Sequence, residues 1–142
     1  MDAIKLLKQQ HDEVKALFSR FEAVEDSDER QEVFEQLADD LAAHTAIEER
    51  IFYPAVFVGE LQDALREAVE EHLAAKRVIA DLLEMEPEDP QFAAKMLVLK
   101  EEIEHHVEEE EGELFPRVKK QFSKDELEAL GSEMERLFDE LQ

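Results

Sequence analysis

The chain has 142 residues, the length of one ordinary domain, and its complete lack of cysteine excludes disulfides and thiolate metal ligands. Its 16 basic and 39 acidic residues give a net charge of −23, which disfavours nucleic acid and anionic membranes as partners because both repel an acidic surface. Residues 1–20 are amphipathic and charged, so we expect no signal peptide or membrane-spanning helix, and a cytoplasmic location is the default.

Few glycines and prolines and an abundance of Ala, Leu, Glu and Lys indicate an all-α protein. Turn signals lie at residues 25–28, between Pro54 and Gly59, and at residues 87–90, while a Ser-x-x-Glu capping box at residues 123–126 starts one more helix. The sequence therefore predicts four long helices of about 20 to 28 residues and a short C-terminal helix.

Each long helix carries a stripe of core positions at intervals of three and four residues. In the first two helices the stripes comprise Ile4, Leu7, His11, Val14, Phe18 and Phe21, then Phe34, Leu37, Leu41, His44, Glu48, Ile51 and Ala55. In the next two they comprise Leu65, Ala68, His72, Lys76, Ile79 and Leu83, then Phe92, Met96, Leu99, Ile103, His106, Glu110 and Leu114. Every stripe is apolar until it reaches one histidine.

A single histidine on a core stripe is most often a hydrogen-bonded core residue. Here four of the five histidines occupy such positions, and Glu48 and Glu110 follow two of them by one helical turn. A carboxylate in an apolar core costs several kcal/mol unless it is paired or coordinated. A metal centre would satisfy all six side chains together.

The spacing of the histidines also predicts the topology. The sequence midpoints between His11 and His44, between His44 and His72, and between His72 and His106 fall within or beside the three predicted turns. Residues equidistant from a turn lie at the same level in antiparallel neighbours, so an up-down-up-down four-helix bundle places the four imidazoles in one layer.

Two segments, residues 44–54 and 106–116, share the frame His-x-x-x-Glu-Glu-x-x-x-aromatic-Pro, so the site consists of two similar helical hairpins. Four imidazoles and two carboxylates exceed the needs of one tetrahedral zinc ion. They suit two metal ions bridged by the carboxylates, with iron favoured and manganese next.

At these motifs the sequence resembles the hemerythrin-like family, the HHE cation-binding domains, over about residues 1–120, with residues 121–142 forming a C-terminal helix packed on or extending that bundle. The resemblance implies two iron ions joined by an oxo or hydroxo bridge. It also implies His11 and His44 as terminal ligands of one iron, His72 and His106 of the other, and Glu48 and Glu110 as bridges.

Lys76 is a departure from this family pattern. Oxygen-carrying hemerythrins have a further histidine one turn after the third-helix ligand, where this chain has Lys76, and an aspartate at +5 where it has Glu110 at +4. An open pair of irons would invite peroxide chemistry instead of simple oxygen carriage. Lys76 either extends its ammonium to solvent or lies near the metals as a cation that does not bind them, and a coordinating amine is the least favoured role.

Several neighbours of these ligands allow two interpretations. His105 is expected at the edge of the bundle, and Glu49, Glu71 and Glu109 at the surface, although each carboxylate could also accept a proton from an imidazole. Tyr53 could be a core residue, a phenolate ligand or a redox partner. The six phenylalanines that should pack the core are Phe18, Phe21, Phe34, Phe52, Phe92 and Phe115. Pro54 and Pro116 should bend or end their helices just past the site.

Three functions remain open at this point. We favour non-enzymatic binding of dioxygen, nitric oxide or peroxide at a diiron centre. The alternatives are a diiron peroxidase or catalase-like enzyme that detoxifies hydrogen peroxide, and iron storage, delivery or sensing. Repair of iron–sulfur clusters, attributed to some relatives, is weakened because those relatives carry a cysteine-bearing segment and this chain has no cysteine. The oligomeric state is unknown.

Overall fold

Seven α-helices and no strand make up the chain in the computed structural model, which describes residues 1–142. Four long helices form the bundle, and each of the second and fourth continues through a π-helical turn into a short helix. In chain order the elements are α1 (Ala3–Ala23), α2 (Ser27–Ile47), a first π-turn (Glu48–Phe52), α3 (Tyr53–Ala55), α4 (Leu61–Leu83), α5 (Pro90–Glu109), a second π-turn (Glu110–Leu114), α6 (Phe115–Gln121) and α7 (Lys124–Leu141). None of these helices is long and apolar enough to cross a membrane.

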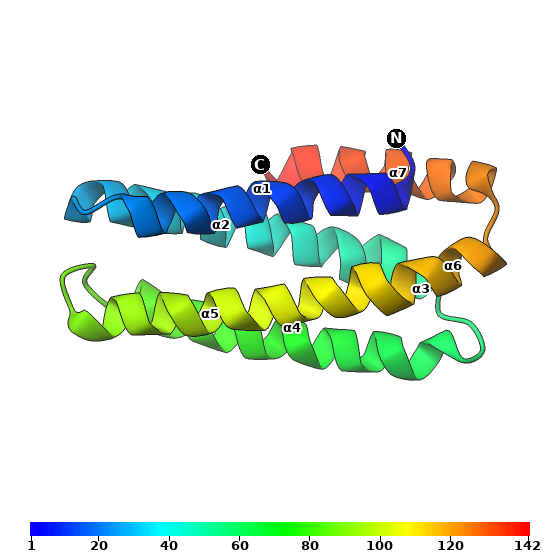
Figure 1. Ribbon diagram of the computed structural model, residues 1–142. Helices are drawn as coiled ribbons and strands as arrows, with labels where there is room; N and C mark the ends of the chain where they lie inside the picture. Colours follow the sequence, from blue (N-terminus) through cyan, green and yellow to red (C-terminus); the bar gives the residue numbers. More distant parts are fainter.

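The helices run up-down-up-down, as the histidine spacing predicts, in two hairpins of α1 with α2 and α4 with α5 (Figure 1). Aspartates begin three of the long helices by accepting a hydrogen bond from a backbone N–H of the first turn, which supplies a partner for one otherwise unpaired donor. These N-caps are Asp2, Asp26 and Asp89.

The C-terminal helix α7 is longer than expected. Its 18 residues begin at the predicted capping box, in which Ser123 and Glu126 exchange side-chain-to-backbone hydrogen bonds. Gly131 lies within the helix, at a position where a Cβ would overlap the backbone of residues 1–3. The helix therefore lies along the first hairpin beside the N-terminus (Figure 1), and Leu127 and Met134 are buried there.

Two hydrophobic clusters occupy the two ends of the bundle, and the four histidines lie between them. One cluster joins the start of α1, the π-turns and α7 around Leu7, Phe52 and Phe115, while the other surrounds Phe34 and Phe92 at the opposite end. All six phenylalanines expected in the core are buried. The apolar ends hold the polar middle layer in place by packing against both sides of it.

The predicted core stripes fail at two places, each for a local reason. The first π-turn shifts the register by one residue, so that Tyr53 and Val56 are buried whereas Ala55 is exposed. On α4, Lys76 and Leu83 face a cleft between the two hairpins instead of a packed neighbour, and Leu83 is 62% exposed.

Candidate metal centre

One imidazole from each long helix enters the central layer. His11 comes from α1, His44 from α2, His72 from α4 and His106 from α5, and all four are buried. Glu48 and Glu110 are the first residues of the two π-turns, with 0% and 2% of their surface exposed. The structure thus brings together all six side chains that the sequence singles out.

The donor atoms fall into two groups that share Glu48. His11, His44, Glu48 and Glu110 each offer a ligand atom, and these atoms lie within 4.8 Å of one another; the same holds for Glu48, His72 and His106. Glu48 Oε1 is 3.3 Å from His44 Nε2 and 3.0 Å from His72 Nε2, so one carboxylate oxygen faces an imidazole of each hairpin.

Glu110 also lies between histidines of the two hairpins. Its Oε1 lies 3.1 Å from His11 Nε2 in the first hairpin, and its Oε2 lies 3.5 Å from His106 Nε2 in its own. Both carboxylates therefore stand between the two pairs of histidines, which is the arrangement expected of bridging ligands.

The π-turns explain how each helix passes the site. The N–H of Tyr53 bonds to the carbonyl of Glu48, and the N–H of Phe115 bonds to that of Glu110, which is a wider loop than an α-helical turn. Pro54 and Pro116 follow at once, and proline cannot donate to the preceding α-helical turn. Each helix widens into a π-turn at the glutamate instead of ending there, a feature that the sequence pattern does not reveal.

Each histidine also has a hydrogen-bond partner at the nitrogen that faces away from the centre. The Nδ1 atoms of His11, His44, His72 and His106 lie 2.6 to 2.7 Å from Glu111, Gln10, Glu49 and Glu71, respectively. These oxygens accept the Nδ1 proton, so in the neutral form of each imidazole the unprotonated nitrogen is Nε2, which faces the middle of the layer.

The four outer partners repeat between the hairpins. Gln10 and Glu71 each directly precede the first histidine of their hairpin and contact the second histidine of the same hairpin. Glu49 and Glu111 each directly follow a central glutamate and contact a histidine of the opposite hairpin. Of the two roles that the sequence allows for Glu49 and Glu71, a surface position or acceptance of an imidazole proton, both residues take the second. Gln10 and Glu111 were missed, although their positions beside a ligand were a usable signal.

Unpaired polar atoms show that these residues suit a cation. Six buried side-chain nitrogen or oxygen atoms have no hydrogen-bond partner, and five belong to the central layer: His11 Nε2, His44 Nε2, Glu110 Oε1 and both oxygens of Glu48. In addition, the Nε2 atoms of His72 and His106 face each other at 3.2 Å. Buried groups left in this state are costly, and a metal ion satisfies lone pairs of both kinds.

Electrostatics supports the same conclusion. Burial acts to raise the pKa of Glu48, but the neighbouring imidazoles, His44 above all, outweigh it and hold that pKa well below its usual value. Burial acts to lower the pKa of His106, yet the facing carboxylates of Glu110, Glu48 and Glu71 raise it well above 6.5. Without a metal the layer attracts protons, and a cation would replace them.

Tyr53 belongs to the site and not merely to the core. Its hydroxyl donates a hydrogen bond of 2.6 Å to Glu110 Oε2 and lies 3.4 Å from His72 Nε2. Burial, together with the two nearby carboxylates, raises the pKa of this phenol well above 10, so it remains a neutral donor. The π-turn places Tyr53 here by moving it inward.

Lys76 combines features of both its expected roles. Its side chain is 53% exposed, and its Nζ lies 3.6 Å from Glu49 Oε2, the oxygen that also contacts His72. It therefore supports an outer partner without approaching the central donor atoms. His105 is exposed, as expected, and pairs with the surface residue Glu109 at 3.0 Å.

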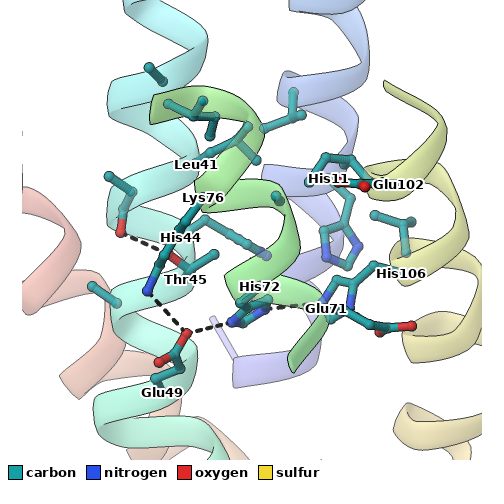
Figure 2. A pocket seen from close by; sticks show the side chains of 18 of the residues that line it. His11, Leu41, His44, Thr45, Glu49, Glu71, His72, Lys76, Glu102 and His106 are labelled. Atoms are coloured by element: carbon teal, nitrogen blue, oxygen red, sulfur yellow. Dashed lines mark hydrogen bonds and ion pairs between the residues drawn. The ribbon is translucent and has the colours of Figure 1, made fainter. Parts of the chain in front are cut away.

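A cavity of about 480 Å³ reaches the histidine layer from the cleft between the hairpins. All four histidines line its floor, and Leu41, Ala75 and Ile79 are among its apolar walls. Figure 2 shows Leu41 and Glu102 on one side of the imidazoles and Glu49 on the other. A small ligand can therefore reach the histidines through this cavity, and neither Glu48 nor Glu110 lines it.

Comparisons with known proteins agree with this geometry. A model of the hemerythrin HHE cation-binding domain matches residues 2–118. The crystal structure of a hemerythrin HHE cation-binding domain-containing protein from Mycobacterium kansasii is 28% identical, with a TM-score of 0.86 over 99% of this chain and 87% of that one. A curated protein from Nostoc sp., named DNA nickase, is 28% identical over 144 residues. The match covers the whole of this chain and 40% of that protein's length.

Proposed function

The chain belongs to the hemerythrin HHE cation-binding domain family, and from this premise we propose that it is a non-haem diiron protein that binds dioxygen, nitric oxide or peroxide. The observation that supports the proposal most directly is the pair of buried donor groups sharing Glu48, in which five atoms have no partner. Two groups with a common carboxylate suit two neighbouring ions better than one.

His11 and His44 would hold one iron, His72 and His106 the other, and Glu48 and Glu110 would bridge them. When bound, a pair of iron ions supplies redox-active Lewis acids to which small oxygen or nitrogen-oxide ligands can attach. The protein's part is to orient the imidazoles through their Nδ1 partners and to pack the layer between two apolar clusters. The cavity gives ligands a route that the bridging carboxylates do not obstruct.

Peroxide turnover is the second candidate, and the position of Lys76 favours it over simple oxygen carriage. Because Lys76 points to Glu49 and solvent, the second pair of histidines gains no further nitrogen ligand. Each ion would then have two histidines and shared carboxylates, with room for a ligand on either. Tyr53, a neutral phenol beside Glu110, is placed to hold a proton there.

The other candidate functions have less support. Iron storage needs places for many ions, whereas the buried groups here suit two. The name of the Nostoc relative does not transfer readily, since this chain spans 40% of that protein, and a net charge of −23 disfavours binding to DNA.

Anaerobic reconstitution with ferrous iron tests the proposal. The metal content is counted first, and dioxygen, nitric oxide and peroxide are then added in turn while the absorption spectrum and oxygen evolution are recorded. Two irons per chain with a stable spectral change on adding dioxygen support ligand binding, whereas catalytic release of oxygen from peroxide supports the enzyme. Fewer than two irons, with no dependence on Glu48 or Glu110, would refute the diiron centre.

A further inference from the structure

The two hairpins repeat the same set of central residues, but their outer hydrogen bonds differ at one position. Gln10 and Glu71 are equivalent in this repeat, since each directly precedes the first histidine of its hairpin. Gln10 Oε1 accepts the Nδ1 proton of His44 over 2.7 Å. Glu71 Oε1 accepts the Nδ1 proton of His106 over the same distance, 2.7 Å. The acceptor is therefore a neutral amide in the first hairpin and a carboxylate in the second.

The other two outer partners are both carboxylates. Glu111 accepts a proton from His11 over 2.6 Å. Glu49 accepts one from His72 over 2.7 Å, and Lys76, 3.6 Å from Glu49, offsets this charge only weakly because its side chain is 53% exposed. The two histidines on α4 and α5 thus have two carboxylate partners, whereas the two on α1 and α2 have one.

The central carboxylates create no comparable difference, because each faces both pairs of histidines. Glu48 Oε1 lies 3.3 Å from His44 Nε2 and 3.0 Å from His72 Nε2. Glu110 likewise faces one histidine of each hairpin, at 3.1 and 3.5 Å. Metal bonds to nitrogen or oxygen ligands are about 2.0 to 2.2 Å long, so all these atoms must move when ions bind, and their present distances do not rank the two positions. The outer partners remain as the difference between them.

A carboxylate partner makes an imidazole a better metal ligand than an amide partner does. Its negative charge draws the Nδ1 proton toward itself and leaves more electron density on Nε2, the atom that faces the metal. The same charge also attracts the cation directly. Because loss of an outer partner weakens metal binding by about 10- to 100-fold, and Gln10 keeps the hydrogen bond but lacks the charge, we expect a difference of about tenfold between the positions.

We propose that Gln10 makes the two metal positions unequal, so that the ion on the α4 and α5 histidines binds first and the ion on the α1 and α2 histidines binds second and exchanges more readily. Gln10 is a positioning residue, which acts through His44 and does not touch the metal. The inference rests on the two-ion centre proposed above and adds an order of filling. At limiting metal, the chain would carry one ion, in the second hairpin.

Titration of the metal-free chain with Co²⁺, a paramagnetic substitute for ferrous iron, tests the order of filling. Coordinated imidazoles give hyperfine-shifted proton NMR signals. Those of His72 are identified by their Overhauser contact with the ring of Tyr53, whose centroid is 5.5 Å away, and those of His11 by Phe115, 6.1 Å away. At one Co²⁺ per chain the His72 signals should be about tenfold stronger than those of His11, and at two they should be equal. Equal signals at one Co²⁺, or stronger signals from His11, would overturn the proposal.

Exchanging the two equivalent residues tests the cause of this order. Gln10→Glu should strengthen binding of the second Co²⁺ about tenfold, measured by competition with a chelator, and Glu71→Gln should weaken binding of the first by a similar factor. The double variant Gln10→Glu/Glu71→Gln keeps the net charge and should invert the order, so that the His11 signals appear first. An unaltered order in the double variant would overturn the role of Gln10.

Neighbouring residues provide matched controls. Gln9→Glu and Glu70→Gln make the same changes of charge at exposed positions that have no hydrogen bond to an imidazole. Each should change the Co²⁺ affinities by less than about twofold, because exposed charges are screened. Equal effects of Gln9→Glu and Gln10→Glu would show that net charge decides, against the proposal. If Gln10→Glu does not fold, the order of filling in the unaltered chain still decides.

The Co²⁺ titration also separates this inference from the two-ion centre. Two bound Co²⁺ ions that fill both pairs of histidines equally would refute the role of Gln10 and leave the centre standing. Fewer than two Co²⁺ per chain, with no dependence on Glu48 or Glu110, would refute the centre and this inference with it.

Discussion

Tyr53 donates a hydrogen bond of 2.6 Å to Oε2 of Glu110, which joins the end of the first hairpin's π-turn to a carboxylate of the second hairpin. Tyr53→Phe removes the donor and leaves that buried oxygen unsatisfied. We expect the metal-free protein to lose about 1 to 3 kcal/mol of unfolding free energy, measured with urea. In the iron-loaded protein the loss should be smaller, because the metal would occupy the same carboxylate. Equal losses in both forms would mean that Tyr53 acts through packing alone.

The stability of the metal-free protein should fall as the pH rises above neutrality. The carboxylates outweigh burial and raise the pKa of His11, His72 and His106 above 6.5 in the folded chain. A raised pKa stabilises the fold below the unfolded value, about 6.5, and this contribution is lost as the pH rises through the folded values. Glu48 has the opposite sign: its lowered pKa stabilises the fold above about 4.5, and the contribution is lost in acid.

In the iron-loaded protein the unfolding free energy should instead rise as the pH increases through neutrality, since metal binding requires unprotonated imidazoles and displaces their protons. Urea unfolding of both forms between about pH 4 and pH 9 checks this. The metal-free protein should be most stable between about pH 5 and pH 6.5, while the loaded protein gains stability from about pH 6 to pH 8. His106→Gln should flatten the alkaline slope of the metal-free protein. Parallel profiles of the two forms would argue against the displacement of protons.

Gly131 allows α7 to approach the N-terminus of α1. A Cβ at this position would overlap the carbonyl oxygen of Met1 and the backbone of Asp2, neither of which is a flexible side-chain end. Gly131→Ala should therefore lower the unfolding free energy by about 1 to 3 kcal/mol, although alanine favours helix formation. Gly112→Ala is the matched control, because a Cβ there meets nothing within 4 Å, and it should not destabilise the chain. Similar thermal unfolding of the two variants would contradict the close contact.

The central layer could be predicted from the sequence because local periodicity determines it. His44 and Glu48, four residues apart, must share a helix face, and antiparallel packing brings residues equidistant from a turn to the same level. The capping box at Ser123 was predictable for the same reason, since its contacts span three residues. Features that depend on neighbours in sequence were therefore recovered.

Features that depend on how the hairpins rotate against each other were not recovered. Glu111 is one of four consecutive glutamates, and its position beside Glu110 marks it as a candidate partner but does not reveal that it reaches His11 across the bundle, whereas Glu108 is exposed. Ala55 was expected in the core and is exposed, because a π-turn adds a residue that helical periodicity omits. Lys76 and Leu83 follow the core spacing but face a cleft whose presence depends on packing between hairpins.

The contact between Glu111 and His11 gives a direct test of the outer hydrogen bonds. Glu111→Ala removes the partner 2.6 Å from His11 Nδ1, so the ring loses its orientation and its Nε2 becomes a poorer donor. We expect iron affinity to fall by about 10- to 100-fold, measured by competition with a chelator. Glu108→Ala removes an equal charge three residues away and should change the affinity little. If the two variants weaken binding alike, the loss reflects net charge, and the contact with His11 has no part in holding the metal.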